Sequence, residues 1–480
     1  MTATGSPGSQ PGDPGLDGGG EIPSTRAVRT RLVLIAGLVA WTACAVILWL
    51  GAAPLGHDEA QYAIAAKDVI VGNPPRWFYL SKGMDAVALP GALAGGSERA
   101  LRVMPLALGI VFALAVAHLA WRTVGARAAA WVVCVLAGMR AFTAQSSELL
   151  SDLPAETFLV FGTTPLVCET LREDGPRWRV IVTAPMFAAA FYLRYASCVP
   201  IAIAGIVVVA MGWRGVAKRP LPILVTGALF LALLVPHFLA AIDTIGSPFG
   251  ILLESQAVTE QWFGEGLLEY VTVNPFVFYG LLAPVVLIVG LLSLRRGAER
   301  SAIVLWLIAV ASVVGIGLTT HARARYIFYP LALLSILGIA EILRRFDMLA
   351  PKLRRIVGPV LAAAVAVTWI LVMRVQLRIA DNRRVTMAST IAAARAITED
   401  VAGRRCRVLG AHNTQLEHYT GCWGNMDAGL PGVSSDPRVY VVDDRSKHWA
   451  AVWHPDLATL PGKPVVILEG PTVTVYRLDP

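Results

Sequence analysis

Asp58 and Glu59 form an acidic pair in the stretch GHDEAQYAIAAKD, directly after an unbroken apolar run. Carboxylates at the mouth of a membrane helix are costly, so a chain keeps them mainly where it needs them. Such a carboxylate can take a proton from a hydroxyl or an amine as that group attacks. The pair also has a structural interpretation, because Asp58 can cap the following helix and Glu59 can interact favourably with its dipole.

Four further stretches beside apolar runs carry side chains that could act with this pair. They are YLSKGMDAVALPGAL with Lys82, MRAFTAQSSELLSDLPAETF with Glu148 and Asp152, AFYLRYAS with Arg194, and THARARYIFYP with His321, Arg323, Arg325 and Tyr326. Arginine and lysine can hold a phosphate, arginine through its forked guanidinium. Cations combined with a carboxylate suit group transfer from an anionic donor, and this chemistry needs no metal ion if arginine stabilises the leaving group. Lys82 and Arg194 could instead extend to lipid headgroups, and Asp152 could cap a helix.

The composition places these residues in a membrane protein. The chain has 480 residues, 56% of them hydrophobic and 15% charged, with a mean hydropathy of +0.61. A soluble globular chain carries about 25% charged residues. Eleven apolar runs approach the length of about 20 residues that crosses a bilayer. We expect spans at 32–53, 100–120, 128–145, 154–170, 179–193, 196–213, 221–242, 275–294, 301–319, 326–343 and 356–374.

Basic residues predict the orientation of these spans. If the N-terminus is cytoplasmic, every inner loop contains arginine, as the positive-inside rule requires. The formal net charge of +8 is therefore mainly a topology signal and does not indicate nucleic-acid binding. Residues 1–31, which are rich in Gly, Pro and Ser, are expected to form a disordered cytoplasmic tail. The first outer loop covers residues 54–99, and residues 32–375 form the transmembrane domain of a multi-pass plasma-membrane (inner-membrane) protein.

The pattern changes in residues 376–480, which we predict to be a small extracytoplasmic α/β domain. The stretch TMASTIAAARAITEDVAG indicates a helix, and CRVLGA, RVYVVDD, KPVVILEG and TVTVYRLD indicate strands. Cys406 and Cys422 lie in this part of the chain, where an oxidising compartment favours a disulfide. Neither the cysteines nor the histidines have the paired spacing of a metal site, so no metal ligands are predicted.

The order of these motifs resembles that of the GT-C glycosyltransferases that use polyprenyl-phosphate sugars, such as protein O-mannosyltransferases and the aminoarabinose transferases of lipid A. The resemblance covers residues 30–345 and rests on HDEAQY after the first span, the lysine of YLSKGMDAVALPGAL, the acidic patch SELLSDLPAETF, AFYLRYAS and RARYIFYP. Gly83 and Met84 stand where the family often has prolines. A soluble C-terminal domain is also common in the family.

The resemblance implies a fold class, an α-helical polytopic membrane protein of the GT-C type with a small C-terminal α/β domain. It also implies a role for each motif residue. Asp58 resembles the catalytic base and Glu59 its neighbour in catalysis or positioning. The donor phosphate would be held by Lys82, Arg194, Arg323 and Arg325. Asp152, Glu148 and Tyr326 would support the acceptor.

The expected activity is inverting transfer of a hexose or pentose from a polyprenyl-phosphate donor at the outer face of the membrane. The acceptor could be a lipid, a glycan or a protein. No cofactor is certain, and a divalent cation is possible. A surface-glycan ligase or polymerase would share the lipid-phosphate chemistry. A secondary transporter would also bury charges, but in mid-span and with inverted repeats.

Overall fold

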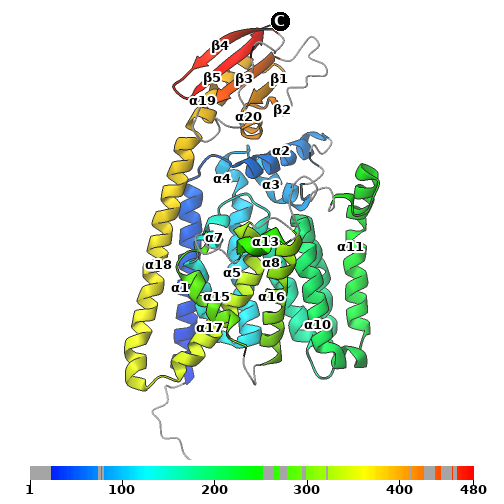
Figure 1. Ribbon diagram of the computed structural model, residues 1–480, viewed down its shortest axis with the longest axis vertical. Helices are drawn as coiled ribbons and strands as arrows, with labels where there is room; N and C mark the ends of the chain where they lie inside the picture. Colours follow the sequence, from blue (N-terminus) through cyan, green and yellow to red (C-terminus); the bar gives the residue numbers. More distant parts are fainter. Residues whose placement is uncertain are drawn as a thin grey trace, which may run out of the picture.

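The computed structural model describes residues 23–73, 77, 80–251, 264–270, 278–294, 299–319, 323–410, 412–425, 438–444, 457 and 462–479. Figure 1 shows a bundle of long helices that carries a small sheet at one end, with short helices between the bundle and the sheet. We call the end of the bundle nearest the sheet the domain side. His321 and residues 1–22 lie outside the described residues.

Each of the eleven apolar runs contains a helix. In chain order these are α1 (Pro23–Leu50), α5 (Val103–Val124), α6 (Ala126–Ala137), α8 (Asp152–Thr170), α9 (Thr183–Leu193), α10 (Cys198–Lys218), α11 (Leu221–Ile245), α15 (Leu282–Leu291), α16 (Arg300–Thr319), α17 (Phe328–Asp347) and α18 (Pro351–Thr386). Among the described residues, seven helical segments are long and apolar enough to cross a membrane, namely those containing α1, α5, α10, α11, α16, α17 and α18. Helices α6, α9 and α15 are shorter, and α8 contains three buried carboxylates. The predicted membrane protein is thereby confirmed, and α1 begins inside the segment expected to be a tail.

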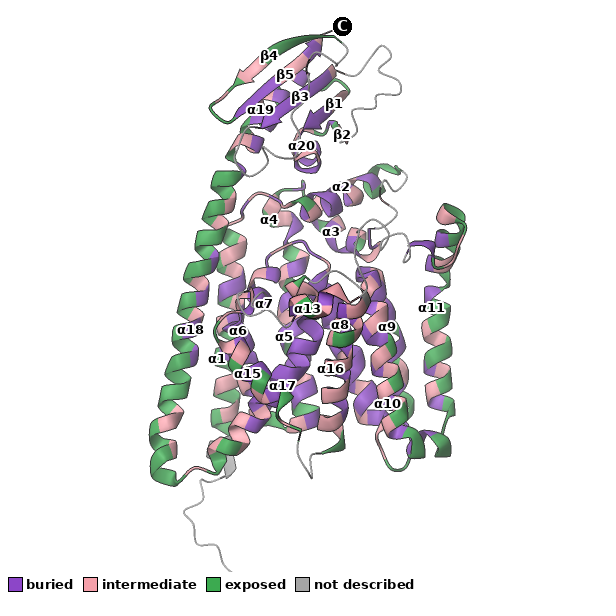
Figure 2. Ribbon diagram, in the orientation of Figure 1, coloured by how far each residue is buried: buried purple, intermediate pink, exposed green. Residues whose placement is uncertain are grey.

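The helices differ in how much of their surface the protein itself covers. The central helix α17 has 78% of its most apolar window buried, whereas α11 and α18 have 17% each. Figure 2 shows the same contrast, with exposed residues along α11 and α18 and buried residues in the interior. Apolar side chains left exposed on a long helix are what lipid contact requires. Because the protein covers most of α17, charged residues that are buried beside this helix lie in the protein interior and not against lipid.

Glycines allow α15 and α17 to pack closely against each other. A Cβ atom at Gly290 of α15 would collide with the backbone oxygen of Leu334, and one at Gly338 of α17 with that of Val286. Small residues at such crossings let membrane helices approach each other, because association in lipid depends on packing and not on the hydrophobic effect. This pair fixes α17, and Arg325 lies in the short turn just before this helix.

The predicted first outer loop is largely helical. It contains α2 (His57–Val71), α3 (Gly83–Leu93) and α4 (Glu98–Leu101), which lie across the domain side of the bundle. These helices have a core of their own, in which Leu55, Tyr62 and Met84 pack against Leu149 and Leu193. The loop that carries the acidic pair is thus a packed layer on the bundle.

The C-terminal part is a five-stranded sheet with order β2-β1-β3-β5-β4. Its elements are α19 (Ala388–Val401), β1 (Cys406–Gly410), α20 (Asn413–Thr420), β2 (Trp423–Asn425), β3 (Arg438–Asp444), β4 (Lys463–Glu469) and β5 (Val473–Asp479). Strand β1 is parallel to β2 and β3, and β5 is antiparallel to β3 and β4. The four predicted strands and the predicted helix are present, and the Cys406–Cys422 disulfide is confirmed. Helix α18 continues through the expected domain boundary at residue 376.

Helix α20 attaches this domain to the layer that contains α2. The hydroxyl of Tyr419 accepts a hydrogen bond from the Leu55 amide (2.9 Å) and donates one to Glu98 (3.0 Å). The ammonium of Lys67 in α2 donates to the carbonyl oxygen of His418 at 3.1 Å. The domain therefore contacts the segment that leads directly into the acidic pair.

Candidate active site

The acidic pair occupies the first turn of α2, after the N-cap residue Gly56. The two carboxylates differ sharply in environment: the side chain of Asp58 is 41% exposed and that of Glu59 is 2% exposed. Helical geometry separates them, because consecutive residues point about 100° apart around the axis. Glu59 therefore faces the protein interior, and Asp58 faces the space above the bundle.

Glu59 is fully engaged by protein groups. Its two oxygens accept hydrogen bonds from Nε and Nη2 of Arg102, both at 2.8 Å, and from the amides of Gly56 (2.8 Å) and Leu149 (2.9 Å). Arg383 approaches to 3.4 Å. Burial alone would raise the pKa of Glu59, but the charge and hydrogen bonds of Arg102, with Arg383 and Gly56, lower it well below its ordinary value. Glu59 thus joins α2, the start of α5 and the end of α18.

Asp58 belongs to a line of alternating charges that crosses the top of the bundle. Nη2 of Arg325 lies 2.9 Å from Oδ2 of Asp58, and Nε of Arg325 lies 3.6 Å from Oδ2 of Asp152. The other oxygen of Asp152 lies 2.8 Å from Nη1 of Arg194. Three predicted stretches and the acidic pair therefore meet in one cluster, which we call the charged line: Asp58, Arg325, Asp152 and Arg194.

Local breaks in the helices place the two arginines. Helix α9 ends at Leu193, and Arg194 has extended backbone angles of φ −157° and ψ 111° before a short 3-10 turn, Tyr195–Ser197. Arg325 lies in a second 3-10 turn, Ala324–Ile327, just before α17. The guanidinium carbon of Arg194 stacks over the ring of Tyr326 at 4.1 Å. Tyr326 thereby orients the cation, as cation–π contacts do.

Lys82 and Arg323 differ from the arginines of the charged line. Lys82 is the N-cap residue of α3, and its amide donates to the hydroxyl of Tyr195 at 3.3 Å. Arg323 is exposed, and its carbonyl oxygen accepts a hydrogen bond from Tyr270. Neither side chain has a carboxylate within ion-pair distance among the residues that the structure describes. Both cations are consequently available to a ligand.

Glu148 lies beside Glu59 rather than on the charged line. Arg383 bridges the two, 3.3 Å from Glu148 and 3.4 Å from Glu59, and Gln145 donates to Glu148 at 3.3 Å. Burial, followed by the charge of Glu59, raises the pKa of Glu148 in spite of the nearby arginines.

The sequence analysis did not identify Arg102 and Arg383 as site residues, nor did it predict that Glu156 is buried. Arg102 was hidden in an apolar run, and Arg383 in the segment after the last span. A signal existed, because both are arginines on the side where the positive-inside rule predicts few. Glu156, one turn after Asp152 on α8, is 3% exposed.

Among the described residues, no group of three or more His, Cys, Asp or Glu side chains is arranged to hold a metal ion. Asp58 is partly exposed and Asp152 is buried, and each is paired with arginine.

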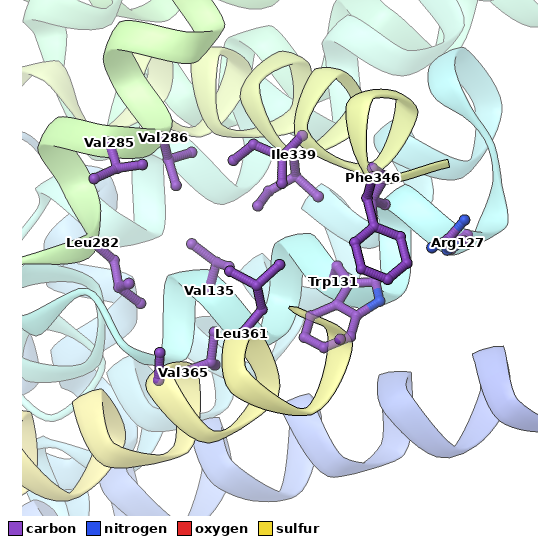
Figure 3. A pocket seen from close by; sticks show the side chains of 14 residues that line it. Arg127, Trp131, Val135, Leu282, Val285, Val286, Ile339, Phe346, Leu361 and Val365 are labelled. Carbon is purple, nitrogen blue, oxygen red and sulfur yellow. The ribbon is translucent and has the colours of Figure 1, made fainter. Parts of the chain in front are cut away.

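An apolar cavity of about 300 Å³ lies away from the charged line, between α6, α15, α17 and α18. Figure 3 shows its wall, formed by side chains such as Trp131, Val286 and Leu361. Its one charged lining residue, Arg127, is paired with Asp347 at 2.7 Å. Its lining residues include no carboxylate or histidine that could take up a proton.

Comparison with known proteins identifies the architecture. Residues 84–239 match the sequence model of a family described as dolichyl-phosphate-mannose-protein mannosyltransferase. The structure superposes on ArnT from Cupriavidus metallidurans, crystallised with undecaprenyl phosphate, with a TM-score of 0.67 and 14% identity, covering 95% of this chain and 98% of ArnT. The chain has the GT-C fold. The resemblance inferred from the sequence is therefore confirmed, and so is the predicted fold class.

Two archaeal structures share the GT-C fold more distantly. The Archaeoglobus fulgidus oligosaccharyltransferase in complex with Zn and sulfate has a TM-score of 0.59 and 13% identity, covering 92% of this chain and 72% of that one. The same organism's AglB in complex with an inhibitory peptide and a dolichol-phosphate has a TM-score of 0.53 and 12% identity, covering 87% and 70%. No curated protein sequence matches this chain significantly.

Proposed function

We propose that the protein transfers a sugar from a polyprenyl-phosphate donor to an acceptor at the outer face of the plasma membrane, with inversion at the anomeric carbon and Asp58 as the base. The observation that carries this proposal is the charged line. It joins a partly exposed carboxylate to two arginines at the end of a membrane bundle. Undecaprenyl phosphate in ArnT and dolichol-phosphate in AglB support a lipid-phosphate donor.

The arginines and Lys82 bind the donor phosphate. Arg325 and Arg194 present guanidinium groups at the domain side, and Lys82 and Arg323 add two cations that no described carboxylate neutralises. The donor phosphate is a diester with one negative charge, and its two unesterified oxygens compete with Asp58 and Asp152 for these guanidiniums. Donor binding consequently draws Arg325 away from Asp58 and frees the base.

Transfer then proceeds in a single displacement. Asp58 takes the proton of the acceptor hydroxyl or amine as its oxygen or nitrogen attacks the anomeric carbon. The bond from that carbon to the phosphate oxygen breaks, and the polyprenyl phosphate leaves with the electron pair. Arginine stabilises the charge that develops on this leaving group. No second carboxylate has to act as a general acid.

Glu59 has a positioning role in this scheme. Both of its oxygens are occupied by Arg102 and backbone amides, so it cannot accept a proton from a substrate without losing buried partners. Its contacts hold the first turn of α2, and with it Asp58, on the bundle. Glu148 supports the same arrangement through Arg383. Asp152 and Tyr326 orient the arginines.

The orientation follows from the distribution of arginine. The loops on the side opposite the domain are basic, which predicts that this side is cytoplasmic. The acceptor then reaches Asp58 from the extracytoplasmic side, under the C-terminal domain. A transporter is less well supported. The residues of the charged line lie at the ends of helices and do not follow a path through the membrane.

The test is transfer by the purified protein in detergent. The donors are radiolabelled undecaprenyl-phosphate mannose, glucose and arabinose, and the acceptor is a membrane extract. We expect one donor to give labelled product and free undecaprenyl phosphate. Nuclear magnetic resonance of the product should show that the anomeric configuration is inverted. Retention of configuration would contradict the single displacement. Uptake of substrate by proteoliposomes without any product would support a transporter instead.

A further inference from the structure

A small cavity opens beside Arg194, below the charged line. It lies between α8, α10 and α16, and its lining includes Glu156, Arg194, Ser197, Ile316 and Tyr326. Its volume of about 10 Å³ accommodates a single water-sized group. The cavity is thus an extension of the proposed donor site, deep enough for one substituent.

Two polar atoms in this cavity have no protein partner. Oε2 of Glu156 and Oγ of Ser197 are buried and form no hydrogen bond with any described residue, and both residues are 3% exposed. More than about 90% of buried polar groups in proteins have a partner. Two such atoms from different helices, facing one cavity beside the donor site, indicate that a ligand or a water molecule completes the arrangement.

The chemistry of the two atoms selects the part of the donor that can enter. A carboxylate oxygen accepts hydrogen bonds, and a hydroxyl can both accept and donate them. The prenyl chain has no hydrogen-bonding group, and a phosphate group is larger than the single water-sized group that the cavity accommodates. The sugar alone carries O–H or N–H donors, so it is the part of the donor that matches the cavity.

We propose that Glu156 and Ser197 form a subsite that recognises one hydroxyl or amino substituent of the donor sugar. This inference rests on the proposed function, since it assumes a donor phosphate on Arg194. The subsite determines specificity: a donor sugar that lacks a hydrogen-bond donor at this position leaves both buried atoms unsatisfied and binds less tightly. Sites that hydrogen-bond a substrate hydroxyl discriminate strongly against analogues without it, for this reason.

The test separates the sugar from the phosphate. Affinities of the detergent-purified protein are measured for undecaprenyl phosphate and for undecaprenyl-phosphate mannose, glucose and arabinose. We define the sugar increment as the affinity for the best-bound sugar donor divided by the affinity for undecaprenyl phosphate. The variants are Glu156→Gln and Ser197→Ala, which remove groups that have no protein partner. Glu169→Gln is the matched control, because Glu169 is also a buried carboxylate of α8 with an unpartnered oxygen, near the opposite end of the helix.

We expect Glu156→Gln to reduce the sugar increment by about 2- to 10-fold, the range for a hydrogen bond between uncharged groups. Ser197→Ala should reduce it by a smaller factor, and neither variant should change the affinity for undecaprenyl phosphate. Glu169→Gln should leave both affinities unchanged. An unchanged sugar increment in Glu156→Gln, or a wild type with no increment for any sugar, would overturn the subsite. Wild-type protein that does not bind undecaprenyl phosphate would instead overturn the proposed function, and the subsite with it.

Discussion

Arg325 donates a hydrogen bond of 2.9 Å to Asp58, although the two residues are 267 positions apart in the sequence. Nε of the same guanidinium faces Asp152 at 3.6 Å. One arginine therefore contacts the proposed base and also the carboxylate that orients the second arginine, Arg194. A phosphate that binds this guanidinium changes the environment of the base directly.

Replacing Arg325 by lysine tests the importance of its forked guanidinium group. Arg325→Lys keeps the positive charge but cannot bind a phosphate through two nitrogens of one plane. We expect the affinity for undecaprenyl phosphate to fall by about 10- to 100-fold, because a hydrogen bond to a charged group is lost. The measurement is a binding titration, with Arg384→Lys as the control. Arg384 is also paired with an aspartate on the domain side but lies outside the charged line. Equal effects of the two variants would contradict a specific role for Arg325.

Removing the charge of Glu59 should damage stability more than chemistry. Glu59→Gln leaves Arg102 buried at 3% exposure without its ionic partner. Breaking a buried pair in this way costs about 3–5 kcal/mol. We expect a clearly lower thermal midpoint for Glu59→Gln, whereas Asp58→Asn should unfold near the wild-type temperature. The double variant Glu59→Leu with Arg102→Met should recover part of the loss. A stable Glu59→Gln that has lost only transfer would give Glu59 a direct chemical role.

The contact between α20 and α2 should weaken in acid. The pKa of His418 is lowered to about 3, chiefly by burial and then by the ammonium group of Lys67. An unfolded chain protonates histidine near pH 6.5, so the folded state loses relative stability as the pH falls from 6.5 toward 3. At pH 5 the loss is about 2 kcal/mol. We expect the thermal midpoint to fall between pH 7 and pH 5 in wild type and to fall less in His418→Gln. The same fall in both proteins would exclude His418 as the cause.

The disulfide should stabilise the C-terminal domain and leave the bundle unaffected. Cys406 and Cys422 close a loop with a sequence separation of 16. A loop of this size contributes about 3 kcal/mol by restricting the unfolded chain. Reduction should therefore speed hydrogen exchange in β1 and β3, while exchange in α5 and α8 stays constant. Unchanged exchange in the strands after reduction would contradict this contribution.

Much of the fold could be predicted from the sequence because lipid imposes a strong pattern on it. All eleven apolar runs contain helices, and the four predicted strands are present. The break between α9 and α10 was also visible, since Arg194 and Tyr195 interrupt an apolar run. Strand β2, three residues long, was not predicted, because so short a segment carries no periodic signal.

The candidate site was predicted in part. The motifs at Asp58, Asp152, Arg194 and Arg325 do meet, and the resemblance to GT-C enzymes supplied their order. The partners of Glu59 could not be predicted, because Arg102 is 43 residues away and Arg383 is 324 residues away, and only the folded chain brings them together. The exposure that separates Asp58 from Glu59 is likewise a property of the packed layer that contains α2. Nothing in two adjacent acidic letters shows which one faces inward.

The central claim is that Asp58 takes the proton of the acceptor, and one comparison tests it most directly. Transfer from the best-used undecaprenyl-phosphate sugar is measured for wild type, Asp58→Asn and the control Asp381→Asn, whose aspartate is exposed and paired with Arg384. We expect Asp58→Asn to lose at least about 100-fold in turnover, the lower end of what general-base catalysis contributes. It should keep its thermal midpoint and its affinity for undecaprenyl phosphate, and Asp381→Asn should behave as wild type. Full turnover by a folded, donor-binding Asp58→Asn would contradict the account.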